Sequence, residues 1–163
     1  MSANPAYAEL CCASNFSFLE GASHPEELVV QAAALGLDAI AITDVSGVSG
    51  LVRAHGAAKQ ARIRLVIGCR LKLEDGPDLL VYPEDRAAYG RLTRLLTEGK
   101  RRALKGECRI VFADVLDKAG VFAAGSGQAV VVIPPRRPDA GFRRALRELT
   151  KNLKLKPYLF VST

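Results

Sequence analysis

The densest group of side chains that could do chemistry is a cluster of basic residues. Five cations fall within residues 100–109, and they are Lys100, Arg101, Arg102, Lys105 and Arg109. We expect them in an exposed loop, because the segment has no apolar periodicity that would hold it in a core. Clustered Lys and Arg neutralise phosphates, so DNA contact, docking against an acidic protein surface and solubility all stay open. The absence of interleaved aromatic residues argues against stacking on single-stranded bases.

Charge is divided unevenly along the chain. Residues 1–90 hold 7 Lys+Arg against 11 Asp+Glu, a net charge of −4, whereas residues 91–163 hold 16 against 6, a net charge of +10. This excess makes DNA a candidate partner of the basic 91–163 region. A second basic group is expected on one exposed helix face, with Phe142, Leu146 and Leu149 opposite, and its members are Arg136, Arg137, Arg143, Arg144, Arg147 and Lys151.

The cysteines and histidines show no spacing typical of a catalytic or metal site. The four cysteines, Cys11, Cys12, Cys69 and Cys108, form no CxxC pair, so core thiols in a reducing compartment are the simpler interpretation. His24 is predicted in the first turn of one helix and His55 inside another, so neither is expected to be catalytic. No phosphate-binding P-loop, GxGxxG motif or Ser-His-Asp set occurs in a suitable context.

Strands and helices alternate along the chain, which predicts an α/β fold with a mainly parallel sheet. Strands are expected at 7–12, 38–43, 64–73, 78–82, 129–133 and 158–161. Helices are expected at 25–35, from about 48 to 62, from 83 to about 99, near Asp114, and at 139–153.

Local signals set the predicted helix boundaries. Ser23-His24-Pro25-Glu26 is typical of a capping box, and Gly36 is a predicted C′ residue. Pro83, Glu84 and Asp85 suit the first turn of a later helix, which Gly99 would close. The inner face of the helix ending near Arg62 is predicted to carry Val48, Leu51, Val52 and His55.

The amino-acid composition limits the classes of protein to which the chain can belong. The 163 residues are 49% hydrophobic and 25% charged, which is typical of one soluble globular domain. No segment approaches the roughly 20 apolar residues that span a bilayer, and the first residues lack a signal-peptide pattern. We therefore expect a cytoplasmic protein with no membrane partner.

Three segments carry a resemblance to a known family: YAELCCASNFSFLEGASHPEELV (7–29), AAALGLDAIAITDVSGVSGLVRAH (32–55) and LVIGCRLKL (65–73). Together they resemble the opening of a PHP (polymerase and histidinol phosphatase) domain. Residues 85–110 resemble, more narrowly, the error-prone branch of bacterial C-family DNA polymerases. The resemblance covers about 7–110 and is weak over 111–163. It implies that 1–163 is a single partial domain, an incomplete PHP-type (βα) barrel with a mainly parallel sheet and flanking helices.

The metal ligands of the family are largely replaced here. In the family the first strand carries His-x-His followed by Ser, the second ends in Thr-Asp-His and the third in Gly-x-Glu. These residues bind metal ions for phosphoester hydrolysis. By position, the two histidines of the first strand fall at Cys11 and Ala13. The later histidine falls at Val45, and the glutamate falls at Arg70.

The donors that remain are Cys11, Glu20, Asp44 and Asp78, and they do not make a closed coordination shell. We expect Cys11, Asp44 and Arg70 near one sheet edge, with Asp44 capping the turn or helix that follows it. No metal cofactor is expected. A manganese, zinc or magnesium ion would be needed only if the domain were active.

The resemblance favours a catalytically silent module of an error-prone, translesion DNA polymerase that supports the polymerase core in DNA synthesis and repair. Its partners would be the remaining domains of the polymerase chain, and nucleotide transfer would lie elsewhere. Two alternatives stay open: a metal-dependent phosphoesterase or proofreading 3′–5′ exonuclease, and a stand-alone basic nucleic-acid-binding domain. The apolar strand expected at 158–161 predicts either a fragment of a longer chain or an edge covered by a partner.

Overall fold

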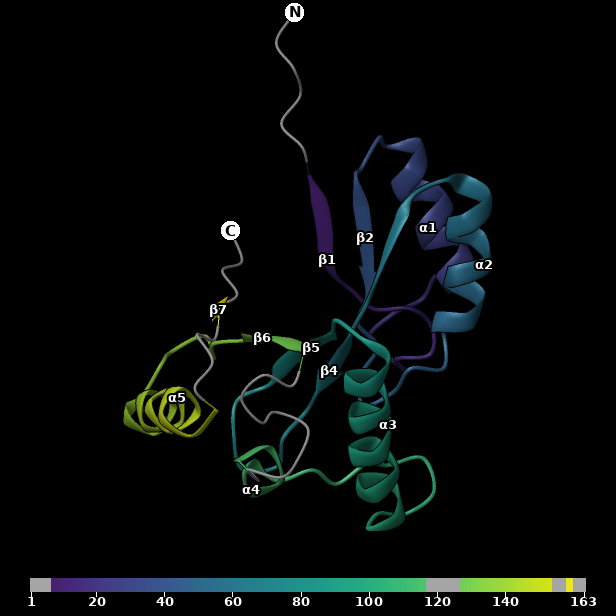
Figure 1. Cartoon of the computed structure of the whole chain (residues 1–163). Coiled ribbons are helices and arrows are strands. Elements are labelled where there is room, and N and C mark those ends of the chain that lie inside the picture. The colour runs from purple at the N-terminus through teal and green to yellow at the C-terminus, as the bar shows by residue number, and fades with distance from the viewer. Residues whose placement is uncertain (1–6, 117–126, 154–157, 160–163) are drawn as a thin grey trace, which may run out of the picture. The chain divides into compact units, whose positions relative to one another are not determined.

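The computed structural model describes residues 7–116, 127–153 and 158–159 (Figure 1). The chain divides into two compact units, Met1–Cys69 and Arg70–Thr163. Within the described residues, no helix is both long enough and apolar enough to cross a membrane.

The first unit is a parallel sheet with two helices. Its elements in chain order are β1 (Ala8–Cys12), α1 (Pro25–Ala34), β2 (Ala39–Ile42), α2 (Leu51–Ala61) and β3 (Arg64–Ile67). The strands lie in the order β1-β2-β3, and both pairs are parallel. The two helices pack side by side beside the sheet (Figure 1). All four residues of β2 are buried, which agrees with its continuous apolar sequence.

The second unit contains a mixed sheet. Its elements are β4 (Cys69–Leu71), β5 (Leu79–Pro83), α3 (Arg86–Arg101), α4 (Phe112–Leu116), β6 (Gln128–Val132), α5 (Ala140–Leu153) and β7 (Tyr158–Leu159). The strands lie in the order β4-β5-β6-β7. The β5–β6 pair is antiparallel, and the β6–β7 pair is parallel. The expected mainly parallel sheet is thus found in the first unit, whereas the second sheet mixes both directions.

One expected strand is divided between the two sheets. The apolar run at 64–73 forms β3, which ends at Ile67, and β4, which begins at Cys69 in the other sheet. The prediction of a single strand was therefore wrong: the Gly68 N–H still donates to the Ile42 carbonyl of β2 at 3.2 Å, and the strand pairing of the other sheet begins at the next residue. Of the last expected strand, 158–159 is β7, and 160–161 lies outside the described residues.

Helix α1 begins at Pro25 as expected, but its N-cap lies one residue after the start of the predicted capping box. His24, not Ser23, is the N-cap, and its backbone N–H donates to Glu27 Oε2 at 2.8 Å. The shift follows from Pro25, which takes the first helical position, where its missing N–H costs nothing. Gly36 ends the helix as predicted, with φ +73° and an N–H that donates to the Ala33 carbonyl at 3.0 Å.

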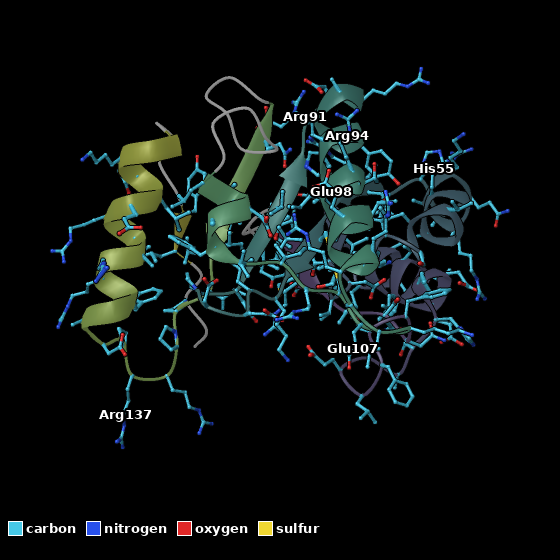
Figure 2. The ribbon with its side chains drawn as sticks, turned by 90° about the horizontal axis from the view of Figure 1, so that it is seen from below. His55, Arg91, Arg94, Glu98, Glu107 and Arg137 are labelled. Atoms are coloured by element: carbon cyan, nitrogen blue, oxygen red, sulfur yellow. The ribbon has the colours of Figure 1, made fainter. Side chains whose placement is uncertain are left out.

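Helix α2 buries a different face from the one predicted. Leu51, Ala54 and Ala58 are buried, whereas Val52 is 82% exposed. His55 is also exposed, and Figure 2 shows it on the outside of the first unit. The prediction is confirmed for Leu51 and wrong for Val52 and His55, because the small Ala54 and Ala58 side chains complete the buried face and let α2 pack closely against α1.

Helix α3 is shifted toward the C-terminus. Pro83 is the last residue of β5, and Asp85 is the N-cap, whose side chain accepts from the Ala88 N–H at 2.6 Å. Gly99 lies inside the helix, where a Cβ would meet Cys108 Sγ at 2.8 Å. Gly99 is therefore a close-packing residue and not the helix end that the sequence suggested.

Candidate functional site

Asp44 is the one buried acidic residue among those described. It follows β2 at the carboxyl end of the strand, where the Thr43 N–H donates to the Cys12 carbonyl at 2.8 Å and continues the β1–β2 pairing. The Asp44 side chain is 1% exposed. A buried carboxylate must be compensated by hydrogen bonds or charge, so its partners reveal its role.

The partners of Asp44 are two serines of the segment after β1. Oδ1 accepts from the Ser14 N–H at 2.7 Å and from the Ser17 hydroxyl at 2.7 Å. Oδ2 lies 2.8 Å from the Ser14 hydroxyl. Ser14 is 0% exposed and Ser17 is 2% exposed, so these contacts are protected from water. Charge-assisted hydrogen bonds of this kind are about twice as strong as neutral ones.

The serine hydroxyls are themselves oriented by backbone donors. Ser14 Oγ accepts from the Phe16 N–H at 3.3 Å, and Ser17 Oγ accepts from the Val45 N–H at 3.0 Å. Each hydroxyl therefore accepts from the backbone and directs its proton toward Asp44. We call Asp44, Ser14 and Ser17 the Asp44 network. Its effect is to hold the segment after β1 against the end of β2.

The Asp44 side chain binds residues that precede it in the sequence and not the turn or helix that follows it. The sequence predicted that its oxygens would cap the turn or helix after β2, but α2 begins with Gly50 as N-cap and without a side-chain cap. The hydrogen-bond partners of the Asp44 side chain belong instead to residues 14–17, which come about 30 residues earlier in the sequence. Local signals could not predict this contact, because it depends on parallel pairing of β1 and β2.

The two adjacent cysteines lie at the end of β1. The Cys11 N–H donates to Glu9 Oε1 at 2.8 Å, and both cysteines are half-buried. Burial raises the pKa of the Cys12 thiol to about 11, and the negative charge of Glu9 adds to the shift. Cys12 is thus a neutral thiol at pH 7.

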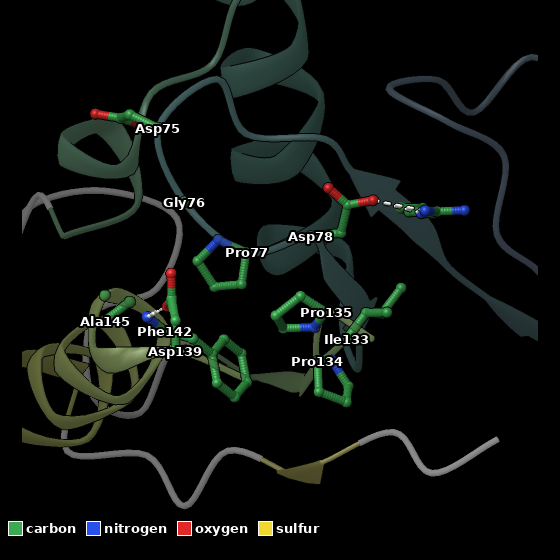
Figure 3. A pocket seen from close by; sticks show the side chains of 12 residues that line it. Asp75, Gly76, Pro77, Asp78, Ile133, Pro134, Pro135, Asp139, Phe142 and Ala145 are labelled. Carbon is green, nitrogen blue, oxygen red and sulfur yellow. Dashed lines mark hydrogen bonds and ion pairs between the residues drawn. The ribbon is translucent and has the colours of Figure 1, made fainter. Parts of the chain in front are cut away.

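The position expected to hold a glutamate carries a cation that is already paired. Arg70 Nε donates to Asp78 Oδ2 at 2.9 Å, and Nη2 donates to the same oxygen at 2.6 Å. Both residues line a pocket of about 540 Å³ in the second unit, together with residues such as Pro77, Pro134 and Phe142 (Figure 3). Asp78, one of the remnant donors, is therefore engaged by the residue that replaced the expected ligand.

The remnant donors are divided between the two units. Cys11, Glu20 and Asp44 belong to the first unit, and Asp78 belongs to the second. Arg70 belongs to β4 in the other sheet, and it directly follows Cys69, whose thiol donates to the Asp44 carbonyl oxygen at 3.5 Å. Over 7–116, 127–153 and 158–159, no three His, Cys, Asp or Glu side chains gather so that they could hold a metal ion.

Comparison with known proteins places the chain in a family. The sequence model that describes the PHP domain family matches residues 9–123. The chain belongs to the PHP domain family. A Caulobacter vibrioides protein named error-prone DNA polymerase is 49% identical to this PHP domain over 159 residues, which are 97% of this chain and 14% of that protein. A Brucella abortus protein of the same name is 50% identical over 151 residues, which are 89% of this chain and 14% of that protein.

Solved structures share the fold of this PHP domain. An amidohydrolase from Chromobacterium violaceum matches 94% of this chain and 76% of its own, with a TM-score of 0.66 and 18% identity. A Bifidobacterium adolescentis protein assigned as a metal-dependent phosphoesterase matches 89% of this chain and 75% of its own, with a TM-score of 0.59 and 17% identity. Identities this low establish the α/β fold and leave the activity open.

The basic residues of 100–109 are exposed, but part of this segment belongs to helix α3 and not to a loop. Lys100 and Arg101 lie in the last turn of α3, so the loop prediction was wrong for them. Arg102 Nη1 donates to both Asp114 carboxylate oxygens at 2.8 Å, and Arg109 Nε donates to Glu74 Oε1 at 2.8 Å. Within the part of the chain that the structure describes, the other three cations, Lys100, Arg101 and Lys105, form no ion pair.

The second basic group is divided between a helix and the segment before it. Arg143, Arg144, Arg147 and Lys151 are exposed on α5, as predicted, and Leu149 on the other face is 1% exposed. Arg136 and Arg137 precede α5 and are not on its face, which corrects the prediction. Figure 2 shows Arg137 projecting from this connecting segment.

Sequence reasoning missed the two serines that define the Asp44 network. A signal for Ser14 was available, because it occupies the position of the serine that follows His-x-His in the family. Ser17 had only a weak signal, a polar residue between Phe16 and Phe18. Its role required the spatial proximity of residues 17 and 44, which sequence spacing does not provide.

Proposed function

We propose that this PHP domain is a catalytically silent module of an error-prone DNA polymerase and supports the polymerase core during translesion synthesis. The observation that carries the proposal is the Asp44 network. Asp44 is the retained acid of the family's Thr-Asp-His motif, and its carboxylate is used to hold residues 14–17 in place.

Hydrogen bonds already occupy lone pairs on both carboxylate oxygens of Asp44. A metal ion needs carboxylate oxygens whose lone pairs point toward it, whereas both oxygens of Asp44 already accept hydrogen bonds from serine donors. Oδ1 is fully used by the Ser14 N–H and the Ser17 hydroxyl, and Oδ2, which keeps one lone pair, lies on a side chain that is only 1% exposed. The neighbouring ligand positions hold Ala13 and Val45, which have no side-chain donor.

The positive charge of Arg70 in the second unit also supports the proposal that the domain is catalytically silent. Arg70 places a permanent positive charge where the family has a glutamate, and its guanidinium binds Asp78. A fixed cation disfavours a divalent ion nearby, because like charges repel more strongly in a low-dielectric pocket than in water. Restoring a ligand here would require both a new acid and the release of Asp78.

A supporting role also agrees with the size of the relatives. The matched region is 14% of the Caulobacter vibrioides and Brucella abortus proteins named error-prone DNA polymerase. In a protein of that length, a PHP domain with replaced ligand positions is best explained as a structural part. DNA synthesis would then be performed by other regions of the polymerase.

The chain is expected to degrade no DNA 3′ end and to hydrolyse no simple phosphoester when manganese, zinc or magnesium is added. The assay uses a 3′-labelled primer-template, with the Asp44→Asn variant as the matched control and an active metal-dependent phosphoesterase as the positive control. Cleavage by the wild-type chain that Asp44→Asn abolishes would contradict the proposal. The domain would then be a phosphoesterase or proofreading exonuclease.

Contact with DNA is a second candidate function, and one observation favours it. Arg102 and Arg109 are neutralised by acidic partners, whereas Lys100, Arg101 and Lys105 are exposed near the end of α3 and form no ion pair with other described residues. Three cations that are not used for folding are available for phosphates. The exposed cations of α5 could extend the same contact, since they belong to the same unit.

Replacing Lys100, Arg101 and Lys105 with alanine should weaken DNA binding and lower the slope of log affinity against log salt by up to about 3, since each phosphate contact contributes roughly 1. Fluorescence anisotropy over a salt series measures this slope. The control replaces Lys59, Arg62 and Arg64, which removes the same charge from the acidic first unit. Equal slopes for both variants would show that net charge, and not this cluster, governs binding.

A further inference from the structure

The segment between β1 and α1 forms a loop with a closed base. The Asn15 N–H donates to the Ser23 carbonyl at 2.9 Å, which joins the two ends of the loop. Within it, the Gly21 N–H donates to the Ser17 carbonyl at 3.0 Å. The Asp44 network fixes the same base from the side of β2. We call residues 16–20 the tip of this loop.

Close packing at Gly21 makes the base rigid. A Cβ at this position would lie 2.3 Å from the Ser14 carbonyl oxygen and 2.6 Å from the Ala13 carbonyl oxygen. Both are backbone atoms, which cannot rotate away as a side chain can. The base of the loop is therefore held by hydrogen bonds and by backbone contact.

The tip reverses the usual placement of polar and apolar side chains. Ser17 is 2% exposed and points to Asp44, while Phe18 is 85% exposed and Leu19 is 90% exposed. Phe16 is 45% exposed. Neighbouring large apolar residues on an ordered surface are informative, because isolated exposed ones are common but grouped ones mark interaction sites.

Leu19 also adopts an unfavourable backbone conformation. Its φ of 63° lies in the left-handed region, which costs free energy for a residue with a Cβ. Strain of this kind persists only when the surroundings enforce it. Here the enforced conformation holds a leucine almost fully in water, so it is not explained by packing within the described chain.

We propose that the tip is a docking element that inserts Phe18 and Leu19 into an apolar, uncharged concavity on another domain of the same polymerase chain. This inference rests on the proposed function. The interface would be small and anchored by an aromatic residue in a pocket, which is typical of energetic hot spots. The Asp44 network would then have a purpose beyond stability, since it positions the docking residues.

The sequence and size of the tip favour this occupant. Residues 13–24 contain no Lys or Arg, so the loop is unsuited to nucleic acid. A stable dimer buries about 800 Å² per partner, which two side chains do not supply. The relatives of 49–50% identity are far longer than the matched region, which is 14% of each, so a neighbouring domain of one polymerase is the simplest source of the concavity.

Hydroxyl-radical footprinting tests the proposal without a substitution in the loop. One sample is the chain of 163 residues, and the other is the Caulobacter vibrioides polymerase with its 159 matched residues replaced by this chain. Oxidation of Phe18 and Leu19 should fall about tenfold in the complete polymerase, because a docked hot spot is fully desolvated. Val52, which is 82% exposed on α2, is the internal control and should not change.

The outcomes separate this inference from the proposed function. An active chimeric polymerase with unprotected Phe18 and Leu19 would overturn the docking proposal and leave the module function standing. An inactive chimera, or one whose PHP domain unfolds independently, would contradict the module function itself. Protection already present in the isolated chain would assign the tip to the second unit, or to a second copy if it rose with protein concentration, and would also overturn the proposal.

Discussion

Replacing Asp44 with alanine is expected to lower the free energy of unfolding of the first unit by about 3 kcal/mol. The carboxylate accepts from the Ser14 N–H and from the hydroxyls of Ser14 and Ser17, all of which are buried. Alanine would leave these donors without an acceptor in a site that water does not reach. Urea denaturation followed by circular dichroism measures the change.

The matched control for this variant is Asp38→Ala, which removes an exposed carboxylate from the same unit. It should change stability by no more than about 0.5 kcal/mol, as surface substitutions usually do. A loss for Asp44→Ala no larger than that of the control would contradict the structural role. A gain in stability would do so more strongly, because functional residues are often kept at a cost to stability.

Replacing Gly21 with alanine is expected to cost about 3 kcal/mol or more, since the new methyl group would overlap backbone that cannot repack. The clash is with the carbonyl oxygens of Ala13 and Ser14, at 2.6 and 2.3 Å. Moving either would also disturb the Ser14 N–H that binds Asp44. The thermal midpoint and the urea midpoint of the first unit should both fall.

Gly56→Ala is the control for the Gly21 variant. Gly56 lies inside α2, and a Cβ there would meet nothing within 4 Å. Alanine is better than glycine in a helix interior by about 0.5–1 kcal/mol, so this variant should be more stable than the wild type. If both glycine variants changed stability in the same direction, the close approach at Gly21 would not be the cause.

Several parts of the fold could be predicted from sequence because their signals are local. Residues 38–43 form a continuous apolar run, and β2 is buried along its length. Gly36 ends α1 because a left-handed position follows the last helical turn. The apolar face of α5, with Leu149 inside, follows from helical periodicity.

Other features could not be predicted, because they depend on packing between residues that lie far apart in the sequence. Val52 was predicted inside and is exposed, because α2 uses alanines to approach α1. The run at 64–73 has strand character throughout, yet the two sheets share it. The partners of Asp44 and the pairing of Arg102 and Arg109 with distant acids are long-range contacts, so the residue types were visible but their roles were not.

If the role of Asp44 is to hold the loop after β1, the chain binds no metal through it. Elemental analysis of the chain, purified without chelator and dialysed against manganese, zinc or magnesium, tests it most directly. We expect far less than one equivalent of any of these metals, and we expect the amount of bound metal to stay the same when Asp44 is replaced by Asn. One equivalent of bound metal that the Asp44→Asn variant loses would contradict it.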